Sequence, residues 1–159
     1  CEGLTRFLDQ VSARLGERAL RLPVPLASHW PERATMHATA SDALKGLDLP
    51  GTRMDMAARP VRGLRPLRLL DRPEEVEVMS AVPDGPPASF RWRRVQRRIL
   101  RAEGPERLAP EWWVDGEDAP PRDYFRIEDT EGQRFWLYRQ GLYERRTVHP
   151  TWFLQGFFA

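Results

Sequence analysis

Cysteine, lysine and long apolar runs are scarce in this sequence of 159 residues. Cys1 is the single cysteine, which excludes an intrachain disulfide and a cysteine-rich zinc site. No apolar run approaches the roughly 18 residues of a membrane-spanning helix, and no signal peptide is visible. We therefore expect a cytoplasmic protein without a membrane segment. Because the chain begins at Cys1 and not at methionine, we also expect a piece of a longer protein.

Lys45 is the single lysine, so arginine supplies nearly all the positive charge. This usage fits either phosphate recognition or the codon bias of a GC-rich genome, and composition alone favours the codon bias. The net charge of +2 conceals two opposed segments. Residues 89–101, called the basic run below, hold six arginines and no acid. Residues 102–132 hold ten acids and three arginines, a balance of −7.

Catalytic groupings are also missing. His29, His37 and His149 are far apart and lack metal-ligand spacing. There is no Gly-rich phosphate loop and no Gly-x-Ser-x-Gly elbow. Glu75 and Glu77 share one strand face, which is typical of a solvated strand and not of a two-metal site. We expect no enzymatic activity, no metal, no cofactor and no small-molecule substrate.

The first third of the chain has a helical pattern followed by a strand pattern. Apolar residues at helical spacing predict a helix over 4–15 that ends at Gly16. The alternating stretch 20–26 contains prolines and predicts a short edge strand. Residues 34–62 lack periodicity and predict a linker, with a short helix near 42–47.

From residue 63 onward the pattern is one of short strands. Strands are predicted at 67–70, 75–78, 90–100, 124–128 and 134–138, and we expect Gly104-Pro105 to break the chain after the third. Asp129 to Gly132 predicts a hairpin turn in which Gly132 supplies a positive φ. The fold class is α+β: a helix and strand, a linker, and a mainly antiparallel β-rich small domain over 63–159. This domain should be a twisted sheet or a partly open barrel.

The basic run is the strongest functional signal in the residues themselves. A basic strand beside aromatic side chains suits single-stranded DNA, because arginines neutralise phosphates while bases stack on rings. The alternative is a solvated face paired with the acids of 102–132, and charge runs favour that alternative. Phe90 and Trp92 on the opposite face are expected in the core. The DNA-binding candidates are Arg91, Arg93, Arg94, Arg97, Arg98 and Arg101.

Aromatic residues gather in the second half of the chain. Most must form the core, but neighbours along a strand point to opposite faces, so some must face outward as anchors for a protein partner. For the terminal Phe157 and Phe158, docking on the domain itself is an equal alternative. The partner-binding candidates are Trp112, Trp113, Tyr124, Trp136, Tyr138, Trp152, Phe157 and Phe158.

Several segments resemble the C-terminal region of the ImuB family. The most specific are Arg122-Asp-Tyr-Phe-Arg-Ile-Glu-Asp129 and Arg134-Phe-Trp-Leu-Tyr-Arg139. The resemblance covers most of the chain, weakly over 34–62. Further similar segments are 65–74, 90–93, 101–113, 141–143 and 152–154, while 8–16 and 28–33 are similar to the exit from the family's little-finger domain.

This resemblance implies a role in bacterial DNA repair. ImuB resembles a Y-family translesion polymerase that lacks its catalytic carboxylates and acts as an adaptor in a damage-induced (SOS) mutagenesis cassette. The implied partners are an ImuA-type protein, an error-prone replicative-type polymerase and the sliding clamp, close to the nucleoid. DNA is the alternative partner. Residues 1–33 would then be the end of a little-finger-like domain.

Clamp-binding peptides of related polymerases begin with glutamine and end in leucine or phenylalanine. Leu67, Leu69 and Leu70 have the apolar positions of such a peptide, but the glutamine is absent. A buried edge strand is the favoured interpretation of this segment.

Overall fold

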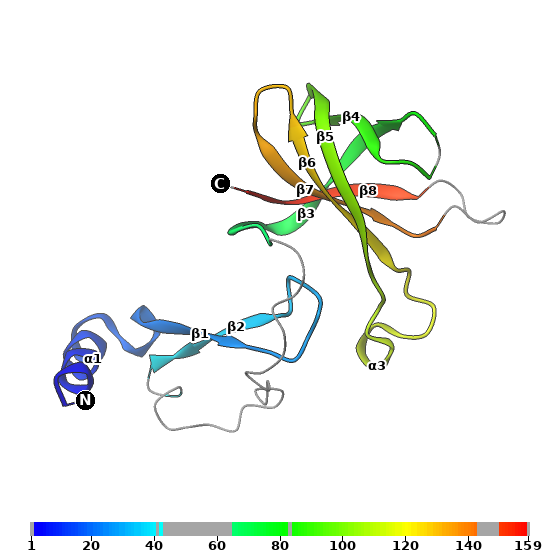
Figure 1. Cartoon of the computed structure of the whole chain (residues 1–159). Coiled ribbons are helices and arrows are strands. Elements are labelled where there is room, and N and C mark those ends of the chain that lie inside the picture. Colours follow the sequence, from blue (N-terminus) through cyan, green and yellow to red (C-terminus); the bar gives the residue numbers. More distant parts are fainter. Residues whose placement is uncertain (1, 41, 43–64, 83, 143–149, 159) are drawn as a thin grey trace. The chain divides into compact units, whose positions relative to one another are not determined.

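The computed structural model describes residues 2–40, 42, 65–82, 84–142 and 150–158 (Figure 1). It separates into two compact units, residues 1–60 and residues 61–159. Among the described residues, no helix combines the length and the apolar character needed to cross a membrane.

The first unit begins with the expected helix. α1 (Glu2–Leu15) is followed by Gly16, which has a φ of 88° and donates its backbone N–H to Ser12. This confirms both the helix and its end. Its apolar side chains are largely exposed, with exposed fractions of 61% for Leu4 and 72% for Leu15. The face that the periodicity defines is therefore not covered by the described residues.

A short two-stranded antiparallel sheet completes this unit. A 3-10 turn, η1 (Glu17–Ala19), leads into β1 (Arg21–Pro25), which pairs with β2 (Thr35–Thr39). β1 confirms the proline-bearing edge strand, since a strand with one neighbour tolerates prolines. β2 was not predicted, because it falls inside the segment 34–62 that lacks periodicity. Residues 43–62, with most of the short helix expected near 42–47, lie outside the described residues.

The second unit is a closed antiparallel barrel of six strands (Figure 1). The β-rich antiparallel domain is thus confirmed, but the barrel is closed and not partly open. Closure follows because the first strand pairs with both the second and the last, which leaves no edge. The strands are β3 (Arg68–Ser80), β4 (Pro87–Trp92), β5 (Val95–Leu108), β6 (Arg122–Asp129), β7 (Arg134–Gln140) and β8 (Thr151–Phe157).

Alternate residues of these strands fill the barrel interior. Phe90 of β4 is fully buried, as the sequence predicts, and its ring meets that of Phe135 edge-on at 5.2 Å. Trp92 is partly buried against the same cluster. The period-2 alternation of the strands therefore sets the inner face. The buried core consists of Val76, Phe90, Phe125, Ile127, Phe135, Leu137, Trp152 and Leu154.

The predicted long strand 90–100 is in fact two strands joined by a tight turn. Trp92 of β4 pairs with Val95 of β5, which leaves Arg93 and Arg94 as the two turn residues. Their φ values are 48° and 67°, and both central residues of a type I′ hairpin turn need positive φ. Arginine is not typical of this turn type, so the sequence pattern does not indicate that a turn is present.

The predicted break at Gly104-Pro105 is wrong, because β5 runs through it. The pairing with β6 shifts register between Glu103 and Glu106, so the two residues form a bulge inside the strand. Gly104 has a φ of 138°, and a Cβ placed there would lie 2.6 Å from the carbonyl oxygen of Tyr124. Only glycine fits this close approach of two backbones.

The β6–β7 hairpin agrees with its prediction. Gly132 has a φ of 79°, and Asp129 Oδ1 accepts backbone hydrogen bonds from Glu131 and Gln133 at 3.0 and 2.9 Å. This side-chain bonding explains why a sequence of Asp, Thr, Glu and Gly turns here.

Candidate functional site

Acidic side chains of β3 pair with the first arginines of the basic run. Arg91 forms an exposed ion pair with Glu77, and Arg93 Nη2 lies 2.6 Å from Glu74 Oε1. Glu74 also accepts a hydrogen bond of 2.7 Å from the indole of Trp92. The hydrogen bonds from Arg93 and Trp92 lower the pKa of Glu74. These arginines are thus paired, though with acids of β3 and not with those of 102–132.

Arg97 is held inside the barrel wall. Its guanidinium donates to Asp129 at 2.7 Å and to Gln133 at 2.5 Å, and it lies 5.0 Å from the ring centre of Phe135. The side chain is only 16% exposed. Arg97 therefore fixes the β6–β7 turn to β5 and has a structural role.

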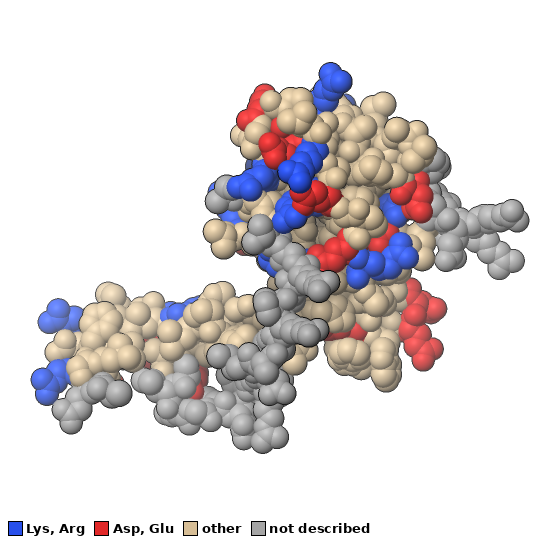
Figure 2. All heavy atoms as spheres, viewed as in Figure 1, with Lys and Arg blue, Asp and Glu red and all other residues tan. Residues whose placement is uncertain are grey.

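Two arginines of the basic run remain without acidic partners. Arg101 pairs with Glu103 at 2.8 Å, whereas Arg94 and Arg98 are exposed and form no ion pair with any described residue. Figure 2 shows arginine and acidic side chains interspersed over the barrel face in view. The free positive charge of the basic run therefore reduces to Arg94 and Arg98.

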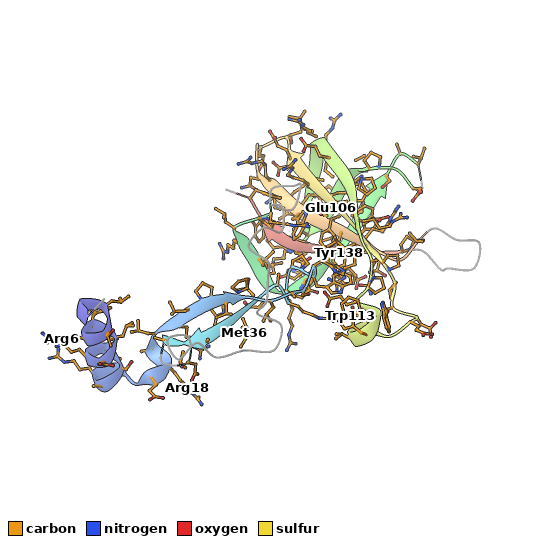
Figure 3. The ribbon with its side chains drawn as sticks, turned by 60° about the horizontal axis from the view of Figure 1, so that its bottom comes forward. Arg6, Arg18, Met36, Glu106, Trp113 and Tyr138 are labelled. Atoms are coloured by element: carbon orange, nitrogen blue, oxygen red, sulfur yellow. The ribbon has the colours of Figure 1, made fainter. Side chains whose placement is uncertain are left out.

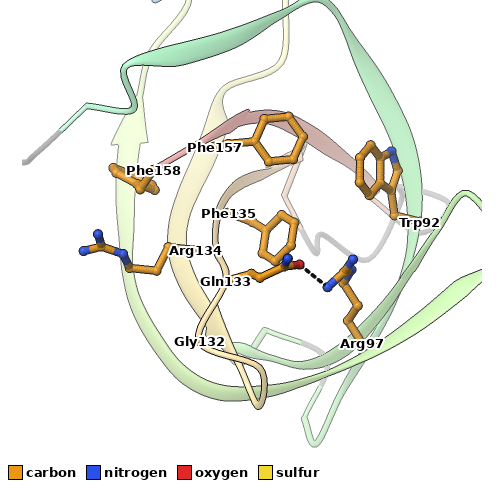
Figure 4. A pocket seen from close by; sticks show the side chains of 8 residues that line it. All are labelled: Trp92, Arg97, Gly132, Gln133, Arg134, Phe135, Phe157 and Phe158. Carbon is orange, nitrogen blue, oxygen red and sulfur yellow. Dashed lines mark hydrogen bonds between the residues drawn. The ribbon is translucent and has the colours of Figure 1, made fainter.

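A cavity of about 490 Å³, called the mouth cavity below, opens at one end of the barrel (Figure 4). Antiparallel connection brings the β4–β5 turn, the β6–β7 turn, the start of β3 and the end of β8 to this end. Three rings form its wall: Trp92 lies 5.5 Å from Phe157, and Phe135 lies 5.8 Å from Phe157 between ring centres. The other lining residues are Arg97, Gly132, Gln133, Arg134 and Phe158.

Arg68, Arg94 and Arg134 belong to elements at this end and form no ion pair with any residue that the structure describes; they are called the rim arginines below, and of the three Arg134 lines the cavity. Arg68 opposes Phe157 in the strand register, and its guanidinium lies 5.9 Å from that ring. Glu128 opposes Arg134 in the register without an ion pair. Arg68 and Arg134 were not predicted as candidates, because the strand pairing that brings them to one end of the barrel joins segments that are far apart along the chain.

A smaller cavity of about 220 Å³ adjoins the mouth cavity, since Arg134 and Phe158 line both. Its other arginines, Arg101 and Arg126, both pair with Glu103, and a second acid, Glu128, also lines this cavity. Hydrogen bonding from Arg126 lowers the pKa of Glu103. This cavity is therefore a less favourable binding site for an anion than the mouth cavity.

A second exposed feature lies in the connection between β5 and β6, as Figure 3 shows for Trp113. The short helix α3 (Trp112–Asp115) leaves Trp112 66% exposed, Trp113 61% exposed and Val114 61% exposed. The two indole rings meet edge-on, with centroids 5.8 Å apart. Trp112, Trp113 and Val114 are called the tryptophan surface below. Its two tryptophans are partner-binding candidates from the sequence, and Val114 is their apolar neighbour.

Four other partner candidates are buried and are not exposed anchors. Trp152 belongs to the core, with its ring 5.3 Å from Phe125. Tyr124, Trp136 and Tyr138 alternate with core residues along their strands and are 1–3% exposed. The ring centre of Tyr124 lies 4.4 Å from that of Trp136 with the planes tilted, so these side chains pack against each other. Phe157 and Phe158 are half-buried at the mouth.

The three leucines of the proposed clamp segment differ in their exposure to solvent. Leu67 is 90% exposed, Leu69 is 36% exposed, and Leu70 packs against the core. This segment opens β3, where Arg68 and Leu69 pair with β8 alone because β4 pairs with β3 only from Glu77 onward, so the strand is present but is not buried as expected. In the part of the chain that the structure describes, no three His, Cys, Asp or Glu side chains gather as a metal site requires. His149 lies outside that part.

The curated proteins that this chain resembles in sequence carry the same name. No family model and no solved structure matches the chain. Protein ImuB of Caulobacter vibrioides, in strains NA1000 / CB15N and ATCC 19089 / CIP 103742 / CB 15, is 40% identical over 165 aligned residues. These cover 99% of this chain but 34% of each relative, so the chain spans about a third of the length of the curated relatives it matches. The chain is therefore a C-terminal ImuB-type region, as its resemblance to that family predicts.

Proposed function

We propose that this chain is a non-catalytic module of an error-prone translesion synthesis cassette and that it works by binding protein partners. The expected partners are an ImuA-type protein, an error-prone replicative-type polymerase and the sliding clamp. The similarity to ImuB supports the cassette, and the tryptophan surface is the observation that carries the binding role. The setting would be the cytoplasm, next to the nucleoid.

The tryptophan surface has the properties of an interaction anchor. Tryptophan is enriched among the residues that dominate binding energy, and exposed clusters of large apolar side chains mark interaction sites. The helix that carries it is fixed at its base, because the backbone N–H of Glu111 donates to Asp115 Oδ2 at 2.8 Å. Glu111 itself is 3% exposed. A fixed base limits the conformational entropy that binding must remove.

Titration calorimetry with each purified partner tests this role. The double variant Trp112→Ala, Trp113→Ala should weaken binding of at least one partner by about 30-fold or more, equal to about 2 kcal/mol for a hot spot. Met79→Ala is the matched control, since Met79 is 69% exposed on β3 and lies outside the tryptophan surface. Unchanged affinity for all three partners in the double variant contradicts the proposal.

Single-stranded DNA binding is a second candidate function, favoured by the unpaired Arg94 and Arg98. Each arginine that neutralises a phosphate releases counterions, so affinity falls steeply with added salt. The double variant Arg94→Ala, Arg98→Ala should weaken binding in fluorescence anisotropy and flatten its salt dependence by about one to two units of slope. Arg101→Ala should do less, because Arg101 is paired with Glu103. An unchanged salt slope in the double variant contradicts DNA binding through these arginines.

The division of the chain is part of the proposal. We assign the unit that holds α1, β1 and β2 to the end of a little-finger-like domain and residues 63–159 to the partner-binding domain, so the linker expected over 34–62 can begin only after β2. The exposed apolar face of α1 supports the first assignment, since a helix with such a face normally packs on a larger domain. Leu67 and Leu69 keep a place as a clamp-contacting segment because both are exposed.

A further inference from the structure

We infer that the mouth cavity is a binding site for one unstacked nucleobase of single-stranded DNA, with the rim arginines holding the flanking phosphates. The inference deepens the second candidate function and rests on it. It moves the DNA contact from the outer face of the basic run to the end of the barrel.

The size and wall of the mouth cavity suit a base. A volume of about 490 Å³ lies within the roughly 300–1,000 Å³ of small-ligand sites. Trp92, Phe135 and Phe157 present their rings around it (Figure 4). Bases stack on such rings regardless of sequence, because every base has a π-face. Trp92 is held in place by the hydrogen bond from its indole to Glu74.

The polar group best placed to meet a base edge is the amide of Gln133. Its Oε1 accepts a hydrogen bond of 2.5 Å from Arg97, as Figure 4 shows, and this fixes which end of the amide is oxygen. The amide nitrogen then remains a donor with no partner in the described part of the chain. Base edges carry carbonyl and ring-nitrogen acceptors that such a donor can bind. A purely apolar ligand would leave this donor unused.

Charge at the mouth favours an anionic chain over an apolar peptide. Arg68, Arg94 and Arg134 come from the start of β3, the β4–β5 turn and the start of β7, and none forms an ion pair with a described residue. Arg91 and Arg107, by contrast, each form an ion pair with an acidic side chain. Unpaired arginines around an aromatic cavity match a base between two phosphates.

The backbone conformation of the β4–β5 turn also supports a functional site at this end of the barrel. Arg93 and Arg94 both have positive φ, a conformation that asparagine and glycine adopt with less strain. Strained residues of this kind gather at functional sites, where the side chain is needed in spite of the backbone. Arg94 lies two positions after the cavity residue Trp92 and carries an unpaired charge where a glycine would only complete the turn.

Two probes of equal length and charge separate the inference from the candidate function on which it rests. One is a fluorescent ten-residue oligothymidylate, and the other is the same backbone with abasic sites throughout. The 159-residue chain is titrated with each at two salt concentrations. We expect the oligothymidylate to bind at least tenfold more tightly than the abasic strand. Equal binding of both probes overturns the base site and leaves phosphate binding standing, whereas no binding of either overturns both.

Variants locate the effect. Trp92→Leu should remove the preference for the oligothymidylate while the salt slope stays unchanged. Because Trp92 also packs on the core, Phe158→Ala is the second variant, as its side chain lines the cavity at the chain's end. If both variants keep the preference while melting as the wild type does, the base lies elsewhere and the inference is wrong.

A charge variant completes the test. Arg94→Gly should weaken both probes alike, by about fivefold at low salt, and should raise the melting temperature by relieving the turn. Arg14→Gln, which removes one charge from α1, is the matched control and should change neither quantity. A lowered melting temperature together with unchanged affinity for both probes overturns the assignment of Arg94 to the rim.

Discussion

Asp123 and Arg139 form an ion pair of 2.7 Å in which both side chains are 1% exposed. Asp123 is the second residue of β6 and Arg139 is the last but one of β7, so the pair occupies the barrel end opposite the mouth cavity. Asp123 also accepts hydrogen bonds from Arg107, and Arg139 lies 2.7 Å from Asp84. One end of the barrel is thus filled by bonded charges, while the other is open and aromatic.

The variant Asp123→Asn should destabilise the fold strongly. The amide cannot balance the charge of Arg139, and breaking a buried ion pair from one side costs about 3 kcal/mol or more. We take the low end because Asp84 still faces Arg139. Urea unfolding measures the loss. The double variant Asp123→Leu, Arg139→Met should be more stable than Asp123→Asn, since no buried charge is then left unbalanced and the former partners Arg107 and Asp84 are exposed. The reverse order contradicts a structural role for this pair.

Stability should fall in acid. Burial alone would raise the pKa of Asp123, but the hydrogen bonds from Arg107 and Arg139 outweigh it and lower that pKa below its ordinary value of 3.8. A lowered pKa in the folded state means that the stabilisation is complete above 3.8 and is lost as pH falls through the lower folded value. Melting temperatures measured between neutral pH and strong acid should drop in this range. The drop should be smaller in Asp123→Asn.

Gly104→Ala should be far more harmful than the same change at Gly132. Both glycines have positive φ, but only at Gly104 does the new Cβ meet backbone, 2.6 Å from the Tyr124 carbonyl oxygen. The β5–β6 pairing must then open at its bulge, whereas Gly132→Ala adds only backbone strain of about 1 kcal/mol. Thermal melting of both variants decides this. Equal losses would mean that the bulge is not closely packed.

Arg94→Gly should stabilise the folded chain by roughly 1 kcal/mol, because glycine adopts positive φ without the Cβ clash. The side chain of Arg94 forms no ion pair that would be lost in the described part of the chain. Arg91→Gly is the contrast, since Arg91 lies in β4 and pairs with Glu77, so this change should destabilise. Chemical denaturation of the two variants should give shifts of opposite sign.

Local features were predictable from the sequence. The helix that ends at Gly16 and the hairpin turn at Gly132 depend on residues within a few positions of each other, and both are found as expected. The turn at Arg93 and Arg94 was missed, since neither residue favours positive φ and the pattern continues on both sides. Gly104-Pro105 signals a break in isolation, yet the partner strand accommodates it as a bulge.

The candidate site was predictable only in part, because it depends on strand register. Trp112 and Trp113 were predicted as candidates for partner binding and are exposed, but Trp152 was predicted in the same way and lies in the core. Burial separates these residues, and burial follows from which face of a closed barrel each strand position takes. The same holds for Arg134, whose place beside the mouth cavity depends on pairing between distant segments.

The most direct test of the partner-binding role is hydrogen–deuterium exchange of the chain with and without a purified ImuA-type protein. Backbone amides of α3 and its flanks, residues 109–118, should become protected in the complex, because the tryptophan surface is expected at the centre of the interface. Protection confined to other parts of the chain, with these amides exchanging as in the free protein, would contradict the account.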